Sequence, residues 1–235
     1  MIKVAVAGAA GKMGATTCGA VEGAPDMELV AKADPVLGAG LEEALAGADV
    51  VVDFTRPDTA LANVLACVEA GVHVVVGTTG FEVESLLAEL GSDARAEGDG
   101  PDGGRPAANV LIVPNFAIGA VLMMRFAAIA AARMAKAEII ELHHDQKLDA
   151  PSGTAKLTAE LMAEATGSQA PPIHSVRLPG LVANQEVILG DVGQTLTIRH
   201  DTTGREAFMP GVLLAVRRVG DLETSPVIGL ESLLF

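Results

Sequence analysis

Ile2-Lys-Val-Ala-Val-Ala-Gly8-Ala-Ala-Gly11-Lys-Met-Gly14, at the start of the chain, decides the fold. Residues 2–7 form an almost continuous apolar run, which is typical of a central strand in a parallel sheet. A glycine loop follows at once, and residues 15–21 continue as a predicted helix. A strand, a glycine loop and a helix in this order are the context that a dinucleotide fingerprint requires. The spacing is Gly-x-x-Gly-x-x-Gly rather than the more common Gly-x-Gly-x-x-Gly.

The next predicted strand ends on an acidic residue that suits a nucleotide site. Residues 27–33 form this strand, and Asp34 follows it, twenty residues after Gly14. A carboxylate at this position would bond the hydroxyls of the adenosine ribose and repel a 2′-phosphate, which favours NADH. Lys12 in the glycine loop partly offsets that repulsion, so NADPH remains the alternative cofactor. The other interpretation of Asp34-Pro35 is a plain turn at the strand end.

Three later strands each lead into a loop at the edge where open α/β sheets bind ligands. These pairs are Asp49–Phe54 with Thr55, Val72–Val76 with Gly77-Thr-Thr79, and Val110–Val113 with Pro114-Asn115-Phe116. Helices are predicted over residues 41–46, 59–70, 82–90 and 117–135. The last of these helices is apolar nearly all round, which predicts burial between domains or subunits.

A second stretch, Glu141-Leu-His-His-Asp-Gln-Lys-Leu-Asp-Ala-Pro-Ser-Gly-Thr-Ala155, carries the candidate chemistry. A strand is predicted before it, over residues 137–142, and a helix after it, over residues 156–165. Ser152 or Asp149 would cap the first turn of that helix. The stretch is therefore a polar loop that joins a strand to a helix N-terminus.

Three features of this loop suggest a site for a carboxylate-bearing substrate that exchanges a proton. His143 and His144 are adjacent, and neighbouring side chains on an extended chain point to opposite faces, so they should serve different purposes. Lys147 supplies a positive charge. The N–H groups of Gly153 and Thr154 open a helix, where an anion can bind. A surface loop with an ordinary helix start would explain a single histidine, but the whole constellation favours a site.

Composition narrows the class of protein. Half of the 235 residues are hydrophobic, which suits an α/β protein with buried strands, and the formal net charge is −14. That charge argues against nucleic acid or an anionic membrane as a partner. Cys18 and Cys67 show no metal-ligand spacing and no disulfide framework, which indicates reduced thiols in a cytoplasmic protein without a metal site. The N-terminus has no signal-peptide layout.

The remainder of the chain predicts a second sheet. Residues 174–178, 185–189 and 194–199 alternate like antiparallel strands, and with residues 137–142 they would form an open sheet. Such a sheet has one face to cover, so a partner subunit is expected. A helix over residues 211–219 follows. Residues 91–109, rich in Gly, Asp, Pro and Ala, are expected to form a flexible, exposed connection.

The pattern His143-His-x-x-Lys147-x-Asp-Ala-Pro-Ser-Gly-Thr-Ala155 resembles the signature of the 4-hydroxy-tetrahydrodipicolinate (dihydrodipicolinate) reductase family. Its members are nicotinamide-dependent enzymes of diaminopimelate and lysine biosynthesis. The resemblance implies hydride transfer from NAD(P)H to a cyclic imine dicarboxylate. It implies that His143 is the acid/base residue, that His144 binds substrate, and that Lys147 both binds substrate and donates a proton. The backbone of Gly153 and Thr154 would hold a substrate carboxylate.

The resemblance also implies a cofactor site, two domains and a homotetramer built on the open sheet. Many members have an arginine for the 2′-phosphate just after the acidic residue, but this chain has Pro35, which puts tight NADPH binding in doubt. The domains are residues 1–116, completed by 209–235, for the dinucleotide, and 117–208 for substrate and oligomerisation. The expected cofactor residues are Gly8, Ala9, Ala10, Gly11, Lys12, Met13, Asp34, Phe54, Thr55, Gly77, Thr78, Thr79, Val113, Pro114, Asn115 and Phe116.

The full expectation is an α/β fold with a Rossmann-type, doubly wound parallel sheet and a smaller α+β domain with an open, mostly antiparallel sheet. Two other classes of protein could share the first domain. One is a different NAD-dependent oxidoreductase, such as an amino-acid or semialdehyde dehydrogenase, and the loop at 141–155 disfavours it. The other is a non-catalytic NAD-binding sensor, which would be expected to have lost His143, Lys147 or the Gly-Thr pair.

Overall fold

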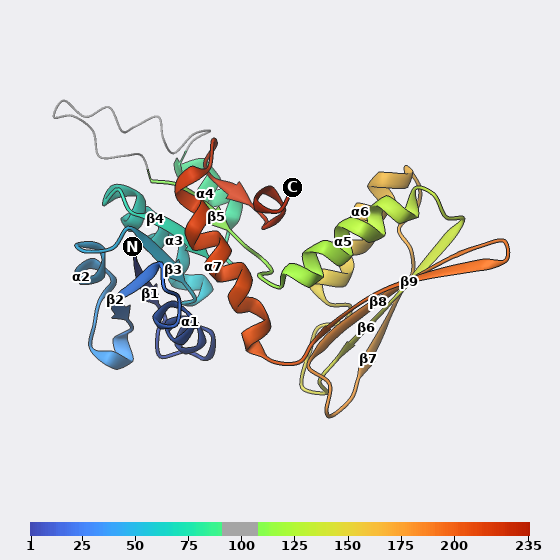
Figure 1. The fold of residues 1–235 in the computed structure, drawn as a ribbon, viewed down its shortest axis with the longest axis horizontal. Helices are drawn as coiled ribbons and strands as arrows, with labels where there is room; N and C mark the ends of the chain where they lie inside the picture. Colours follow the sequence, from blue (N-terminus) through green and yellow to red (C-terminus); the bar gives the residue numbers. More distant parts are fainter. Residues whose placement is uncertain (91–107) are drawn as a thin grey trace. The chain divides into compact units, whose positions relative to one another are not determined.

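The computed structural model describes residues 1–90 and 108–235, which divide into two compact units (Figure 1). The first unit comprises residues 1–116 and 208–235 with the gap just stated, and the second comprises residues 117–207. The connection predicted over residues 91–109 lies outside the described residues except for its last two positions. Each unit has its own sheet.

The first unit is built on a parallel sheet of six strands in the order β10-β5-β4-β3-β1-β2. The chain places β2 on one side of β1 and β3 on the other, so the topological switch point lies between β1 and β3. This is the doubly wound sheet predicted from the sequence. Its strands are β1 (Ile2–Ala7), β2 (Met27–Ala33), β3 (Val50–Asp53), β4 (His73–Val76), β5 (Val110–Ile112) and β10 (Val227–Ile228).

Helices cover both faces of this sheet. Helices α3 and α4 lie on one face, while α1 and α7 contact each other on the opposite face (Figure 1). Helix α1 begins at Lys12, three residues earlier than predicted, because the glycine loop closes quickly into the first turn. The helices are α1 (Lys12–Glu22), α2 (Leu41–Leu45), α3 (Pro57–Glu69), α4 (Val83–Leu90) and α7 (Met209–Arg218), with short 3₁₀ turns η1 (Pro35–Leu37), η3 (Val219–Asp221) and η4 (Glu231–Leu233).

The apolar strands form the core of the first unit. Val51, Val74 and their neighbours in β3 and β4 have no exposed surface, and α3 packs Val64 onto them. Strands buried on both faces need apolar residues at successive positions, which explains the uninterrupted valine runs. The C-terminal segment returns to this unit and adds β10 beside β5. The core therefore positions the carboxyl ends of β1, β3 and β4 rigidly.

The second unit contains a mixed sheet of four strands in the order β7-β6-β8-β9. Strands β6, β8 and β9 pair antiparallel, whereas β7 pairs parallel to β6. The antiparallel prediction for the strand at residues 174–178 was therefore wrong, because helix α6 forms the long crossover that a parallel pair requires. The elements are α5 (Ile118–Ala131), β6 (Lys136–His143), α6 (Gly153–Thr166), β7 (Ile173–Arg177), β8 (Ala183–Asp191) and β9 (Gln194–Thr202), and η2 (Arg205–Phe208) follows at the boundary of the units.

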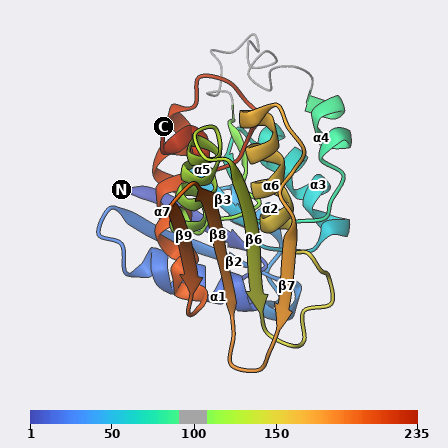
Figure 2. The ribbon, with the colours of Figure 1, turned by 90° about the vertical axis from the view of Figure 1, so that its right-hand side faces the viewer.

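The two faces of this second sheet differ. Helices α5 and α6 pack on the face that carries Ile139, Val187 and Leu189, and these side chains are fully buried. Figure 2 shows the other face, turned toward the viewer, with α5 and α6 behind the strands. The side chains on that open face alternate with the core positions and include half-buried Ile140 and Ile188. The predicted open face is thus present.

Candidate active site

Two close backbone approaches shape the glycine loop between β1 and α1. Gly8 has a φ angle of +75°, and a Cβ added there would lie 2.5 Å from the carbonyl oxygen of Phe54. A Cβ added at Gly14 would lie only 2.1 Å from the carbonyl oxygen of Gly8. A side chain at either position would displace backbone, so the loop can pass this close only with glycine.

The loop leads into a helix N-terminus that is suited to a phosphate group. The first intrahelical bond of α1 runs from the N–H of Ala15 to the carbonyl of Gly11 at 2.9 Å. The amides of Lys12 and Met13 precede that bond and point out of the helix end. The Lys12 side chain is exposed beside them, Ala10 is also exposed, and Ala9 is buried under the loop.

Asp34 ties the glycine loop to the turn that follows β2. Its Oδ2 accepts a hydrogen bond from the N–H of Ala10 at 3.0 Å, and its Oδ1 accepts one from the N–H of Val36 at 2.9 Å. The plain-turn interpretation is therefore correct for the backbone. Because an ionised carboxylate has about four acceptor positions, two further hydroxyl donors can still be accommodated.

A cavity of about 820 Å³ opens at the carboxyl ends of β1, β2 and β3. Its volume lies within the range of cofactor and small-molecule sites. Arg56 also lines it, with its guanidinium paired to Asp58 at 2.9 Å, and this cation was missed by the sequence reasoning. The predicted cofactor residues that line the cavity are Gly8, Gly11, Asp34, Phe54 and Thr55.

Asp53, at the end of β3, organises two of the predicted cofactor loops and was not predicted as a site residue. Its side chain is fully buried. It accepts hydrogen bonds from the N–H and Oγ1 of Thr55 at 2.9 and 2.7 Å, from Oγ1 of Thr78 at 2.7 Å, and from Nδ2 of Asn63 at 2.8 Å. Four donors compensate the buried charge and fix both loops. The available signal was an aspartate that closes an otherwise apolar strand.

The remaining predicted cofactor residues lie at the ends of β4 and β5, beyond the cavity. The rings of Phe54 and Phe116 pack together with centroids 5.5 Å apart, and both lie against the Cα of Gly77. The N–H of Val113 donates to the carbonyl of Val76 at 2.8 Å, which holds this segment beside β4. Thr79 and Pro114 are exposed, and Asn115 is half-buried. The structure thus brings the β3, β4 and β5 loops together.

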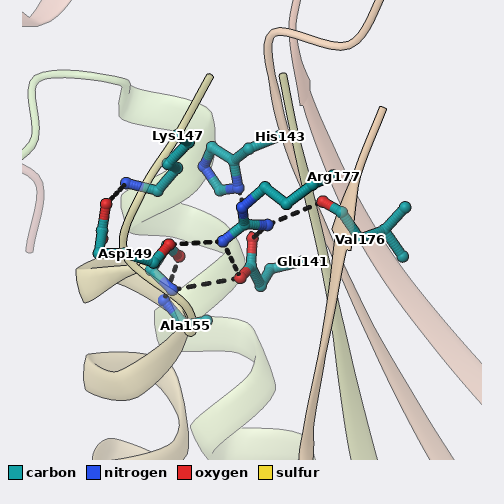
Figure 3. A network of polar contacts seen from close by, with 8 residues as sticks. Glu141, His143, Lys147, Asp149, Ala155, Val176 and Arg177 are labelled. Atoms are coloured by element: carbon teal, nitrogen blue, oxygen red, sulfur yellow. Dashed lines mark hydrogen bonds and ion pairs between the residues drawn. The ribbon is translucent and has the colours of Figure 1, made fainter. Parts of the chain in front are cut away.

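In the second unit, His143 is the last residue of β6, and its imidazole Nδ1 pairs with the carboxylate of Glu141 (Figure 3). Burial lowers the pKa of His143, and the hydrogen bond and charge of Glu141 oppose that shift without cancelling it. The ring is therefore neutral near pH 7. His144 is exposed and follows on the opposite side of the strand, as predicted.

The loop after β6 places Lys147 beside the helix that follows. Its Nζ pairs with Oδ1 of Asp149 at 2.7 Å. Ser152, and not Asp149, caps α6, because its Oγ accepts from the N–H of Ala155 at 3.2 Å. Gly153 and Thr154 form the first turn of α6, and Gly153 is exposed. The predicted cation and the predicted anion-binding amides thus belong to one short loop.

A buried ion pair that the sequence reasoning missed lies beneath this loop. Glu141 has no exposed surface, and Arg177 of β7 donates to both of its oxygens at 2.8 and 2.9 Å (Figure 3). Burial raises the pKa of Glu141, but hydrogen bonds from Arg177, Ser175 and His143 outweigh burial and lower the pKa to about 2. Alternation along β6 could have revealed Glu141, because it falls on the same face as Ile139.

Within residues 1–90 and 108–235, the His, Cys, Asp and Glu side chains form no group of three or more that could hold a metal ion. In the same part of the chain, no helix has the length and apolarity needed to cross a membrane.

Comparison with known protein families decides the identity. Residues 2–95 match the family described as dihydrodipicolinate reductase, N-terminus, and residues 119–234 match the family described as dihydrodipicolinate reductase, C-terminus. This chain belongs to the dihydrodipicolinate reductase family. Membership confirms the predicted function, the reduction of 4-hydroxy-tetrahydrodipicolinate, and excludes a dehydrogenase of another family.

Similar members of the family extend over the whole chain. The 4-hydroxy-tetrahydrodipicolinate reductase of Thermobifida fusca (strain YX) is 49% identical, covering 100% of this chain and 99% of that protein. The Nocardia farcinica (strain IFM 10152) enzyme is 47% identical, covering 99% and 98%. The dipicolinate-bound dihydrodipicolinate reductase from Paenisporosarcina sp. TG-14 superimposes with a TM-score of 0.84 at 36% identity, covering 99% of both chains. This last similarity confirms the predicted two-sheet α/β fold.

More distant structures share the fold alone. A probable dehydrogenase from Thermotoga maritima has a TM-score of 0.65 at 13% identity. The aspartate semialdehyde dehydrogenase of Candida albicans has a TM-score of 0.56 at 14% identity. The Rossmann-type unit is therefore common to several oxidoreductases, and the loop at 141–155 is what distinguished the family in the sequence.

Proposed function

We propose that His143 is the acid/base residue of the reductase reaction and that Lys147 is its proton donor. The observation that carries this proposal is the single loop in which the Glu141–His143 pair, the Lys147 ammonium and the N-terminus of α6 occur together. In this family the substrate is a cyclic dicarboxylate that gains a hydride. These groups provide both the proton and the anion binding that such a substrate needs.

Each group has a distinct task in this proposal. The amides of Gly153 and Thr154, at the positive end of the α6 dipole, bind one substrate carboxylate. His144 contributes a further substrate contact. Lys147 donates the proton that accompanies hydride addition and loss of the hydroxyl group as water, and His143 returns a proton to Lys147. The bound nicotinamide supplies the hydride.

We assign cofactor binding to the first unit and substrate binding to the second. The cavity at the switch point, the glycine loop and the α1 N-terminus fit a dinucleotide, since they combine a close backbone approach with outward-pointing amides. NADH is the preferred cofactor, because Asp34 lines the cavity and exposed Pro35 follows it. Lys12 is exposed near the phosphate position and leaves weaker NADPH binding as the alternative.

Titration with each cofactor tests the preference. Wild-type protein should bind NADH more tightly than NADPH. Asp34→Ala should weaken NADH binding by about tenfold, on the basis of the ~1.5–3 kcal/mol assigned to a hydrogen bond with a charged group. Tighter NADPH than NADH binding by the wild type, or unchanged NADH affinity in the variant, would contradict the assignment.

A homotetramer assembled through the open face of the second sheet is also proposed. The half-buried side chains of Ile140, Leu142 and Ile188 give that face an apolar centre. The pairs Arg199–Glu186 and His174–Glu138, each at 2.9 Å, surround it. Light scattering coupled to gel filtration should give four times the chain mass, and a monomer at micromolar concentration would be inconsistent with this assembly. A cytoplasmic location is proposed with it, since the buried thiols suit a reducing compartment.

Kinetics of single variants test the catalytic assignments. Lys147→Ala and His143→Ala should each lower kcat by about 10²–10⁴-fold, the usual contribution of general acid–base catalysis. Lys156→Ala, an exposed lysine on the same helix–loop segment, serves as the control and should retain kcat. Near-normal turnover in either of the first two variants would show that the roles are misassigned.

A further inference from the structure

The Glu141–Arg177 pair is the largest buried polar feature that the proposed reaction does not use. Glu141 lies on the helix-covered face of β6 and has no exposed surface. A carboxylate in such a place is costly unless it is paired and fully hydrogen-bonded. Its burial beside His143, rather than a valine or isoleucine that would extend the core, calls for a reason in the site itself.

Both oxygens of Glu141 are occupied. Oε1 accepts from Nη2 of Arg177 at 2.8 Å and from the N–H of Ser152 at 3.3 Å. Oε2 accepts from Nη1 of Arg177 at 2.9 Å and pairs with Nδ1 of His143. Figure 3 shows the guanidinium, the carboxylate and the imidazole gathered around one centre. The carboxylate therefore links the histidine to the N-cap of α6.

Arg177 is itself fixed from two sides. Its Cα is the register partner of His143 in the parallel β6–β7 pair. Nη1 also donates to the carbonyl of Val176 at 2.7 Å, and Nη2 donates to the carbonyl of Asp149 at 2.7 Å. Such a planar, bidentate and crosslinked guanidinium holds the Glu141 carboxylate in one orientation.

We propose that Glu141, held by Arg177, is a positioning residue that keeps His143 protonated on Nδ1 and free to accept a proton on Nε2. The proposal rests on the acid/base role assigned to His143 above. An ionised carboxylate only accepts hydrogen bonds, so the nitrogen that faces it must carry a hydrogen. In a neutral imidazole the other nitrogen is then the acceptor. When Nε2 takes up a proton, Glu141 stabilises the imidazolium.

The protonation states agree with this assignment. The pKa of Glu141 is lowered to about 2, so the carboxylate stays ionised across the neutral range. The other charged groups that act on His143 are Lys147 and Arg177, and both favour the neutral ring. Opposite Glu141 on β8 lies buried Gln185, which carries no charge and donates to Oγ1 of Thr158 at 2.7 Å.

Glu141 also sets the position of the base relative to the anion site. Because one oxygen of Glu141 receives the Ser152 N–H, the same carboxylate fixes the start of α6, where Gly153 and Thr154 would bind substrate. Catalysis depends on placing base and substrate within a fraction of an ångström. Loss of Glu141 should therefore affect kcat more than the affinity for NADH.

Glu141→Gln tests the proposal by kinetics and by nitrogen NMR of the histidine rings. We expect kcat to fall by about 10²–10⁴-fold, as when a histidine loses its orienting carboxylate. Since the Glu141 charge raises the pKa of His143, removing it should move the acid limb of the kcat/KM profile to lower pH. The His143 resonances, assigned with His143→Ala, should change from the Nδ1–H tautomer to a mixture. Unchanged kcat, pH profile and tautomer would overturn the proposal.

Two further variants separate positioning from folding. Glu141→Gln/Arg177→Met removes both charges, which is often tolerated in a core. It should bind NADH normally yet keep the low kcat, whereas near-wild-type kcat would overturn the proposal. Asp26→Asn breaks the exposed bidentate pair with Arg217, at 2.6 and 2.9 Å, and should leave kcat unchanged. If His143→Ala itself kept normal turnover, the acid/base role would fail first, a result distinct from failure at Glu141 alone.

Discussion

Substitution of Gly14 by alanine should damage both the stability and the cofactor site of the first unit. Gly14 is buried in the first turn of α1, where the helix crosses the glycine loop. The new Cβ would lie 2.1 Å from the carbonyl oxygen of Gly8, 2.7 Å from its carbonyl carbon and 2.9 Å from the Cα of Ala9. Ordinary contact begins at 3.4 Å, so the helix and loop must separate by more than 1 Å. The contacted atoms are all backbone, and no side chain can rotate away.

The expected magnitude follows from two opposing effects. Alanine inside a helix is favoured over glycine by roughly 0.5–1 kcal/mol. Overpacking a tight contact costs about 1–3 kcal/mol, and the separation also strains the charged hydrogen bond from the Ala10 N–H to Asp34. We expect a net loss of about 1–2 kcal/mol in the free energy of unfolding. For a chain of this size that lowers the thermal midpoint by several degrees.

Gly19→Ala is the matched control in the same helix. Gly19 is exposed, and a Cβ there would have no atom within 4 Å. It should therefore stabilise the protein by roughly 0.5–1 kcal/mol. Calorimetry should show the two variants shifting the midpoint in opposite directions, and NADH titration should show weakened binding for Gly14→Ala alone. Equal stabilisation by both variants, with equal NADH affinity, would refute the argument from close approach.

Three other perturbations have definite expectations. The pKa of Glu141 is lowered from 4.5 to about 2, so its contribution, on the order of 3 kcal/mol, is present above pH 4.5 and is lost as the pH falls toward 2; acid unfolding curves of wild type and Glu141→Gln should converge there. Ser152→Ala removes the α6 cap from the buried Ala155 N–H and should cost about 1 kcal/mol in urea unfolding, while unchanged stability would disprove the cap. Asp53→Asn turns an amide donor toward the Asn63 side chain or the threonines and should weaken NADH binding, and an unaltered dissociation constant would argue against its ordering of the loops.

The sequence was informative wherever local pattern determines structure. The apolar run at residues 2–7 and the glycines after it predicted the sheet, the loop and the first helix, because a buried parallel strand and a close approach each leave a local signature. The strand-loop-helix at residues 141–155 was equally readable. Of the two possible caps, Ser152 and Asp149, only the structure could choose, because Asp149 instead pairs with Lys147.

The features that escaped prediction depend on pairings between distant parts of the chain. Glu141 and Arg177 are 36 positions apart and meet only because β7 lies parallel to β6. That parallel pairing follows from the α6 crossover, which alternation within residues 174–178 cannot reveal. Asp53 likewise gathers Thr78 from a neighbouring strand end. Long-range partners of buried charges have no local pattern, so they require the fold.

The most direct test of the account is a coupled assay of the reductase reaction. Pyruvate and aspartate semialdehyde would be condensed by the preceding synthase, and nicotinamide absorbance followed with NADH and NADPH separately, for wild type and Lys147→Ala. We predict oxidation that depends on the condensation product, is faster with NADH than with NADPH, and falls by about 10²–10⁴-fold in the variant. Wild-type protein that binds NADH without oxidising it in the presence of the condensation product would contradict the assigned reaction.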